Sequence, residues 1–193
     1  MKTILLLLLI VFSVSQDQLV GGWQKRSIQE NSFEIDQSFK KAGLRYIKDH
    51  PETNLDDLLR LTVYSQIVSG TNYKVTFFDT NDKLQTIHEY IVYKPLGNKR
   101  KRFLFKVTEH NEYNPINGLL SEDDASMQML EDKLSNHLKD TKEKLYNIRY
   151  AYPVETAETL YYIITASTAE GNHRYIIYQD KQSKEFYDFQ KIN

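Results

Sequence analysis

Side chains that could perform covalent or acid–base catalysis form no recognisable arrangement in this chain. The sequence contains no cysteine, no Gly-x-Ser-x-Gly nucleophile motif and no phosphate-binding loop. Four of its five histidines lack the close spacing of a metal site: His88, His110, His137 and His173. Glu155 and Glu158 form a pair of nearby carboxylates, but a solvated loop is the simpler interpretation because no residue of a catalytic cleft accompanies them. We therefore expect no enzymatic activity, no catalytic or metal-binding residues and no cofactor.

The composition argues against further classes of function. The 25 basic and 26 acidic residues nearly balance, so the chain has no electrostatic basis for binding nucleic acid or a membrane surface. Without cysteine, no disulfide can stabilise the fold, and its stability must come from the burial of apolar side chains. The 14 tyrosines and 9 phenylalanines suit amphipathic strands.

The amino-terminal residues have the pattern of a secretory signal peptide. Lys2 precedes an apolar run over residues 4–12, and Ser13-Val14-Ser15 offers a small-x-small cleavage site. The run is too short to cross a bilayer. We expect residues 1–15 to be removed and the mature chain to be secreted into the extracellular space or the endolysosomal lumen, without membrane attachment. An uncleaved anchor or a buried helix is the alternative.

Residues 33–49 are predicted to form an amphipathic helix. Apolar residues recur there at steps of four, three and four, which places them on one face: Ile35, Phe39, Ala42 and Tyr46. Asn31 or Ser32 could cap its start. His50-Pro51 is expected to end it, because the residue before proline avoids the helical region.

Antiparallel strands are predicted to follow this helix. From Thr62 the β signals dominate, and Tyr73, Val75 and Phe77 alternate with polar residues. Further strands are predicted over residues 84–93 and 103–107, each after a turn. Residues 55–61 are ambiguous between a helical turn and the start of a strand. One helix followed by four antiparallel strands indicates an α+β unit with the helix on one face of the sheet.

The same order of elements is predicted a second time. Residues 109–124 have the composition of a linker. An apolar stripe at helical spacing follows and reaches Leu145: Met127, Leu130, Leu134 and Leu138. Strand patterns then occupy residues 145–152, 160–166, 174–178 and 186–189. This restart indicates an internal duplication with a period of about 90 residues.

Three short segments stand in an order that is typical of one inhibitor family. Gln66-Ile67-Val68-Ser69-Gly70 is uncharged and runs directly into a strand pattern, Gly21-Gly22 lies upstream, and Pro95-Leu96-Gly97 lies downstream. In this order and spacing they resemble the cystatins, which inhibit papain-like cysteine proteases. The residues Gln66, Val68 and Gly70 match the family's Gln-x-Val-x-Gly motif. The resemblance implies a cystatin-like fold, an antiparallel sheet wrapped around one helix, present in residues 16–112 and, in degenerate form, in residues 113–193.

The resemblance also implies that the three segments form a wedge that enters the cleft of the protease. Residues 66–70 supply small, uncharged surface that can be desolvated without burying an unpaired charge. Val68 is the expected apolar contact, and Gly70 is expected to permit a positive φ at the exit of the turn. Gly21 and Gly22 would let the amino-terminal segment approach closely, while Leu96 would cover the primed side of the cleft. Such a preorganised wedge is expected to bind tightly because little conformational freedom is lost on binding.

The chain departs from the family in three respects. Secreted cystatins usually carry two disulfides, whereas this chain has no cysteine. Leu96 follows Pro95 where that group usually has Trp, and the smaller apolar area could weaken a complex by on the order of 1–2 kcal/mol. In the second half, Val154-Glu155-Thr156-Ala157-Glu158 occupies the place of the central loop, with two carboxylates and no glycine. The second half is therefore not expected to inhibit through the same edge.

Each segment also has a purely structural interpretation. Residues 66–70 can be an ordinary turn, Gly21-Gly22 a flexible tail and residues 95–97 a hairpin turn on any β protein. The basic run 98–102 can be a solubilising flank or a surface that attracts anions. The alternative function is a non-inhibitory secreted binding module on a cystatin-like scaffold. A domain-swapped dimer and the identity of the target protease are left open.

Overall fold

The computed structural model describes residues 22–27, 32–96, 104–116, 119–120, 125–141 and 143–192. The predicted signal peptide, Gly21, Gly97 and the basic run 98–102 lie outside these residues. The chain divides into two compact units, Met1–Phe77 with His88–Asn111 and Phe78–Ile87 with Glu112–Asn193. The described residues include two hydrophobic cores, one around each α-helix.

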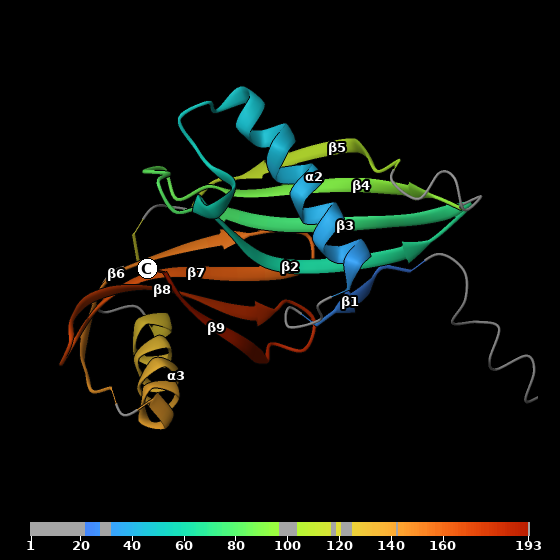
Figure 1. Cartoon of the computed structure of the whole chain (residues 1–193). Coiled ribbons are helices and arrows are strands. Elements are labelled where there is room, and N and C mark those ends of the chain that lie inside the picture. Colours follow the sequence, from blue (N-terminus) through green and yellow to red (C-terminus); the bar gives the residue numbers. More distant parts are fainter. Residues whose placement is uncertain are drawn as a thin grey trace, which may run out of the picture. The chain divides into compact units, whose positions relative to one another are not determined.

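The first sheet has five antiparallel strands in the described part of the chain, in the order β1-β2-β3-β4-β5 (Figure 1). The strands are β1 (Gln24–Arg26), β2 (Leu58–Ile67), β3 (Gly70–Asp79), β4 (Ile87–Pro95) and β5 (Lys106–Tyr113). From β2 onward, strands that are consecutive in sequence are neighbours in the sheet, so they pair without crossovers.

Helix α2 (Phe33–Asp49) has the predicted bounds. The hydroxyl of Ser32 accepts a hydrogen bond from the backbone N–H of Ile35 at 3.3 Å, so Ser32 is the N-cap. His50 is the C-cap, directly before Pro51, and its backbone N–H donates to the carbonyl of Tyr46 at 3.1 Å. Local signals in the sequence therefore account for both ends of this helix.

The helix α2 buries its apolar face against the first sheet. Ile35, Ala42 and Tyr46 are all nearly or completely buried. They share a core with buried residues of the strands and of the approach to β5: Leu58, Val63, Tyr73, Val75, Phe77, Tyr90, Val92 and Phe105. The alternation along β3 thus has the buried face that the sequence predicts. Burial of apolar surface stabilises a fold by roughly 25 cal/mol per Å². In a unit without disulfides, this core is therefore the main stabilising contribution.

The ambiguous segment 55–61 contains both of the elements that its sequence allows. A short 3-10 turn, Leu55–Asp57, is followed directly by β2. Leu55 and Leu58 then cover Gly43 of α2, where a Cβ atom would lie 2.5 Å from one leucine Cδ1 and 3.0 Å from the other. Glycine at this helical position therefore allows the close approach of the 3-10 turn and the sheet.

The end of the first sheet differs from the prediction. β5 begins at Lys106 rather than at residue 103, and it continues to Tyr113 through residues that the sequence assigns to a linker. Most side chains of β5 are exposed, which fits its position at the edge of the sheet. Residues 108–112 of this edge strand are polar and exposed on both faces, so no hydrophobic alternation marks the second half of β5.

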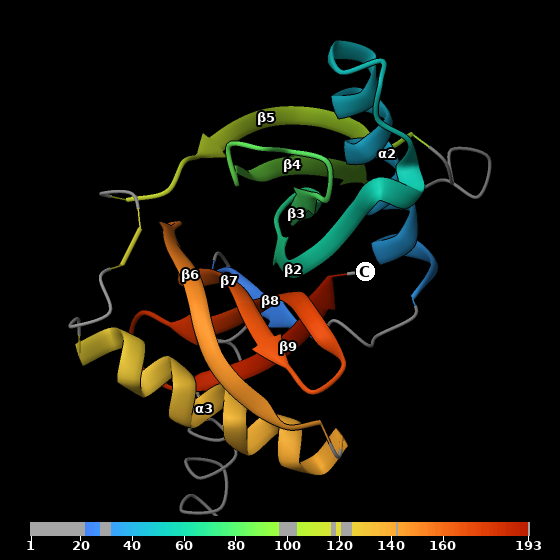
Figure 2. The same cartoon turned by 90° about the vertical axis from the view of Figure 1, so that its left-hand side faces the viewer.

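The second unit contains α3 (Ala125–Thr141) and four antiparallel strands in the order β6-β7-β8-β9. The strands are β6 (Leu145–Glu155), β7 (Thr159–Thr168), β8 (Gly171–Asp180) and β9 (Phe186–Ile192). Figure 2 shows α3 lying along β6. The four residues of the predicted apolar stripe, from Met127 to Leu138, are buried in the core of this unit. The prediction that the stripe reaches Leu145 is wrong, because α3 ends at Thr141 and Leu145 begins β6.

The described residues therefore form a mixed α+β protein with two α-helices and two antiparallel sheets of five and four strands. Each unit has a helix followed by four strands, which is the predicted order of elements. The second unit also includes Phe78–Ile87 from the first half of the sequence. The domain bounds 16–112 and 113–193 remain a prediction.

Candidate functional site

The central loop of the predicted wedge is a tight hairpin between β2 and β3. β2 ends at Ile67 and β3 begins at Gly70, so Val68 and Ser69 form the turn. The backbone N–H of Val68 donates to the carbonyl of Gly70 at 3.0 Å. Ile67 is 52% exposed and Val68 is 43% exposed. Their apolar side chains are therefore available to a partner. A binding residue needs this exposure, whereas a core residue would be buried.

Gln66 has a supporting position beside this turn. Its side chain is half-buried, and its Oε1 atom accepts a hydrogen bond from Nδ2 of Asn72 at 3.3 Å. The bond joins β2 to β3 across the hairpin. Gln66 thus stabilises the base of the turn, while Ile67, Val68 and Ser69 form its exposed tip.

Gly70 is required for close approach and not for a left-handed backbone. The expectation of a positive φ at this position is wrong. Among the glycines that the structure describes, Gly171 has a positive φ and Gly70 does not. A Cβ atom on Gly70 would lie 2.6 Å from Cε2 of Tyr93 and 2.8 Å from its Oη, and it would also meet the carbonyl oxygen of Lys94. The end of β4 therefore occupies the space of a side chain at residue 70.

Gly22 lies at the same end of the sheet as the hairpin. β1 pairs with β2 in an antiparallel register that places Gln24 opposite Ser65 and Arg26 opposite Val63. Gly22 precedes β1 by two residues, so it lies beside the end of β2, where the turn begins. It is exposed, and a Cβ atom there would have no neighbour within 4 Å. Packing within the described residues therefore does not require glycine at this position.

The third segment begins where β4 ends. Pro95 is the last residue of β4, and Leu96 is 74% exposed directly after it. The hydroxyl of Tyr93 donates a hydrogen bond to the carbonyl of Ser69 at 3.3 Å. This bond joins β4 to the tip of the β2–β3 hairpin. The described parts of all three predicted segments thus meet at one end of the first sheet, where β2 and β4 terminate together (Figure 1).

Two residues at this end were not predicted from the sequence. Leu104, 59% exposed, lies just before β5 and at the same end of the sheet as Leu96, because β4 and β5 are neighbouring antiparallel strands. Its position in an apparent strand pattern concealed its exposure. Tyr93 has no motif signal, and only the three-dimensional contact with Ser69 and Gly70 identifies it. We call Gly22, residues 66–70, residues 95–96 and Leu104 the sheet-end surface.

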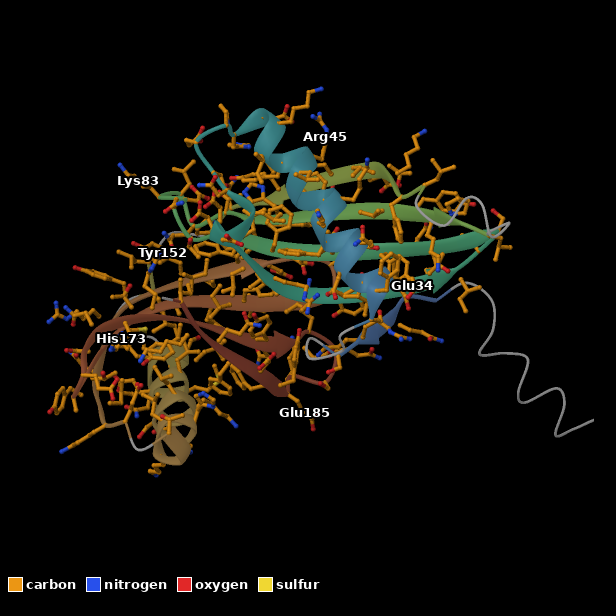
Figure 3. All side chains as sticks on the ribbon, in the orientation of Figure 1. Glu34, Arg45, Lys83, Tyr152, His173 and Glu185 are labelled. Carbon is orange, nitrogen blue, oxygen red and sulfur yellow. The ribbon has the colours of Figure 1, made fainter. Side chains whose placement is uncertain are left out.

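An ion pair anchors the end of β4 to the start of α2. Nζ of Lys94 lies 3.0 Å from Oε1 of Glu34. Glu34, labelled in Figure 3, stands in the first turn of the helix. The hydrogen bond from Lys94, together with one from the backbone N–H of Glu34 itself, holds the pKa of this carboxyl below its usual value. The helix and the strand that supports the hairpin are therefore joined beside the sheet-end surface.

The corresponding hairpin of the second unit differs in charge. β6 and β7 are joined by residues 156–158, and Thr156 is buried. The ammonium of Lys181 forms an ion pair with Glu155 and donates to the carbonyl of Thr156 at 3.1 Å. Insertion of this hairpin into a protein cleft would desolvate the ion pair, at a cost that attraction between the charges does not reliably offset.

Two neighbouring strands of the first sheet place three potential metal ligands close together. The ligand atoms of His88 on β4 and of His110 and Glu112 on β5 lie within 4.8 Å of one another. The rings of His88 and His110 are stacked at 5.9 Å with 27° between their planes, and His110 also stacks on Tyr90 at 4.1 Å. Since an imidazole nitrogen binds a metal in the plane of its ring, two stacked rings do not converge on one ion. One ring would have to rotate before both could bind it.

A pocket of about 200 Å³ in the second unit is lined by residues of α3 and β6: Met127, Gln128, Glu131, Asn147 and Ile148. Oε1 of Glu131 accepts a hydrogen bond from the backbone N–H of Ile148 at 3.3 Å, next to an irregularity in the β6–β7 register. The carboxylate thus satisfies a backbone group of an edge strand. This structural contact explains its position in the pocket.

No protein-family model matches the chain, and a search of curated proteins found no similar sequence. In the described part of the chain, no helix combines the length and the apolar character that a membrane crossing requires. The arrangement at the sheet end offers exposed apolar and uncharged polar groups. Exposed groups of these kinds are suited to contact with another molecule.

Proposed function

We propose that the chain is a reversible, tight-binding inhibitor of papain-like cysteine proteases. The sheet-end surface of the first unit, with Gly21 and Gly97, would bind the active-site cleft. Residues 16–112 and 113–193 are each proposed to form a cystatin-like domain, the second one degenerate. With residues 1–15 as a signal peptide, the mature inhibitor would be secreted into the extracellular space or the endolysosomal lumen.

The observation that carries this proposal is the exposure of apolar residues at one end of the first sheet. Single exposed apolar residues are common on protein surfaces. Here Ile67, Val68 and Leu96 are exposed on segments that the Tyr93–Ser69 hydrogen bond holds together. Grouped apolar side chains on a well-ordered surface are characteristic of an interaction site.

The energetics of the hairpin favour binding in a narrow cleft. Residues 66–70 contain no charge, so desolvation leaves no ion without a partner. The turn is closed by the Val68–Gly70 backbone bond and braced at its base by Asn72. Because these contacts order the hairpin before binding, little conformational entropy remains to be lost in the complex.

Titration of papain with the purified mature chain tests the proposal. We expect stoichiometric loss of activity that is recovered on dilution and displaced by excess substrate. An absence of inhibition at high micromolar concentrations would favour the alternative, a secreted binding module on the same scaffold. Cleavage of the chain in parallel with recovery of activity would show a substrate and not an inhibitor.

Deletion of the mature chain through Gly22 tests the contribution of the amino-terminal segment. A side chain at residue 22 would have no neighbour within 4 Å, so removal of Gly22 should leave the first core intact. We expect weaker inhibition of papain with an unchanged thermal midpoint. Full retention of inhibition by the truncated chain would restrict the surface to the two hairpin segments.

A further inference from the structure

Tyr93 contacts the β2–β3 hairpin in two distinct ways. Its hydroxyl donates to the carbonyl of Ser69 in the turn, and its ring lies directly against the backbone of Gly70. Tyr93 belongs to β4, which is a neighbour of β3 but not of β2. The side chain therefore connects the tip of one hairpin to the strand that leads to Leu96.

The contact depends on the pairing of a large residue with glycine. A Cβ atom at residue 70 would lie 2.6 Å from the ring of Tyr93, closer than real Cβ contacts come. The ring thus fills the space that a side chain at residue 70 would need. The position of the tip relative to β4 is consequently determined by a steric contact and a hydrogen bond together.

The strand that carries Tyr93 is itself anchored. The next residue, Lys94, forms the ion pair with Glu34 at the start of α2. From the helix through β4 to the turn, the chain of contacts comprises Glu34, Lys94, Tyr93 and Ser69. Such supporting contacts keep a binding loop in the conformation that its partner requires.

We infer that Tyr93 is a positioning residue for inhibition: it holds the β2–β3 hairpin in register with the end of β4, so that both tips enter the protease cleft together. This inference rests on the proposed function. Tyr93 acts on the population of the competent hairpin, whereas Val68 and Leu96 act by direct contact. Loss of a positioning residue lowers the fraction of molecules ready to bind, and the apparent affinity falls by that fraction.

The kinetics of papain binding distinguish these two roles. Tyr93→Phe removes only the hydroxyl, and we expect an association rate constant about fivefold lower. Tyr93→Ala also removes the ring, and we expect its association rate constant to be about 30-fold lower than that of the wild type. The smaller decrease in Tyr93→Phe would show that the ring supplies most of the effect. The dissociation rate should change little in both, whereas a contact variant such as Leu96→Ser should mainly raise it. Tyr150→Phe in the second unit, at a 49% exposed tyrosine, is the matched control and should keep the wild-type rates.

Hydrogen exchange in the free protein tests the same inference without a protease. The N–H of Val68 donates across the turn, and its exchange should be about fivefold faster in Tyr93→Phe than in the wild type. Wild-type exchange and wild-type association rates in both Tyr93 variants would overturn the inference while leaving the proposed function intact. If the wild-type chain does not inhibit papain, the proposed function fails. In that case the exchange experiment still tests Tyr93: an exchange rate at Val68 that is the same in the wild type and in Tyr93→Phe would reject its role in positioning the hairpin.

Discussion

The backbone of Gly70 faces the carbonyl oxygen of Lys94 so closely that no side chain fits between them. The motif glycine of the hairpin is thus explained by a neighbour in β4. Substitution of Gly70 should therefore disturb the hairpin, because any side chain at this position must push the hairpin away from β4.

Gly70→Ala is expected to weaken papain inhibition about tenfold, equivalent to about 1.4 kcal/mol of binding free energy. The methyl group would displace the turn from Tyr93 and Lys94 while the core of the first unit remains intact. Inhibition constants and far-UV circular dichroism measure the two effects. Gly171→Ala is the control, since its φ of +125° is strained for alanine. That variant should lose stability and keep inhibition, and the opposite pattern would contradict the role of Gly70.

Local signals explain how much of the fold could be predicted. Ser32 and His50-Pro51 bound α2 through interactions within a few residues, so its ends are visible in the sequence. Tyr73, Val75 and Phe77 mark β3 because one face of this strand is buried against α2. Where apolar and polar residues alternate and the determinants are local, periodicity predicts the element correctly, even though Lys74, Thr76 and Phe78 of β3 are buried on its other face.

The missed features depend on contacts between distant residues or on the absence of burial. β5 is polar and exposed on both faces from residue 108 to 112, so this part resembles a linker. The packing of Tyr93 on Gly70, and the proximity of His88 to His110, exist only once neighbouring strands are paired. The sequence could therefore indicate the three segments of the proposed binding surface, but not the residues that hold their described parts in position.

Leu104 is expected to contribute to binding together with Leu96. Both leucines are exposed at the same end of neighbouring strands, so under the proposed function both would present apolar area to the protease cleft. At roughly 25 cal/mol per Å², Leu96→Ser and Leu104→Ser should each raise the inhibition constant about fivefold. Leu84→Ser is the matched control, because Leu84 is 73% exposed and precedes the start of β4, whereas Leu96 follows its end. An equal effect of all three substitutions would indicate a general loss of surface hydrophobicity.

The second unit is expected to take no part in papain inhibition. Glu155→Ala removes the ion pair with Lys181, which is partly exposed and contributes at most about 1 kcal/mol to stability. The inhibition constant should stay within about twofold of the wild-type value. Val68→Asp, which places a charge on the first hairpin, should instead weaken inhibition about 100-fold or more, because this charge would be desolvated in the cleft. A comparable loss in both variants would assign the binding surface to both units.

Glu143 is expected to stabilise the second unit in a manner that depends on pH. Its carboxylate accepts hydrogen bonds from Lys191 at 2.7 Å and Tyr175 at 3.0 Å. The bond from Lys191, reinforced by that from Tyr175, holds the pKa of Glu143 below its ordinary value of 4.5. A depressed carboxyl pKa in the folded state stabilises the fold above the unfolded value, and this contribution disappears as the pH falls through the folded value.

Glu143→Gln should therefore lower the free energy of unfolding by about 1 kcal/mol at neutral pH, measured by urea denaturation. The difference from the wild type should shrink as the pH falls below the ordinary glutamate value and through the lowered pKa of Glu143, because the wild-type carboxyl then also becomes protonated. Glu170→Gln is the control, because Glu170 is 61% exposed and lies 3.6 Å from Lys191. It should change stability little at neutral or acidic pH. A loss in Glu143→Gln that is equal at neutral and acidic pH would mean that the charge of this carboxylate does not contribute, and that the substitution acts through packing alone.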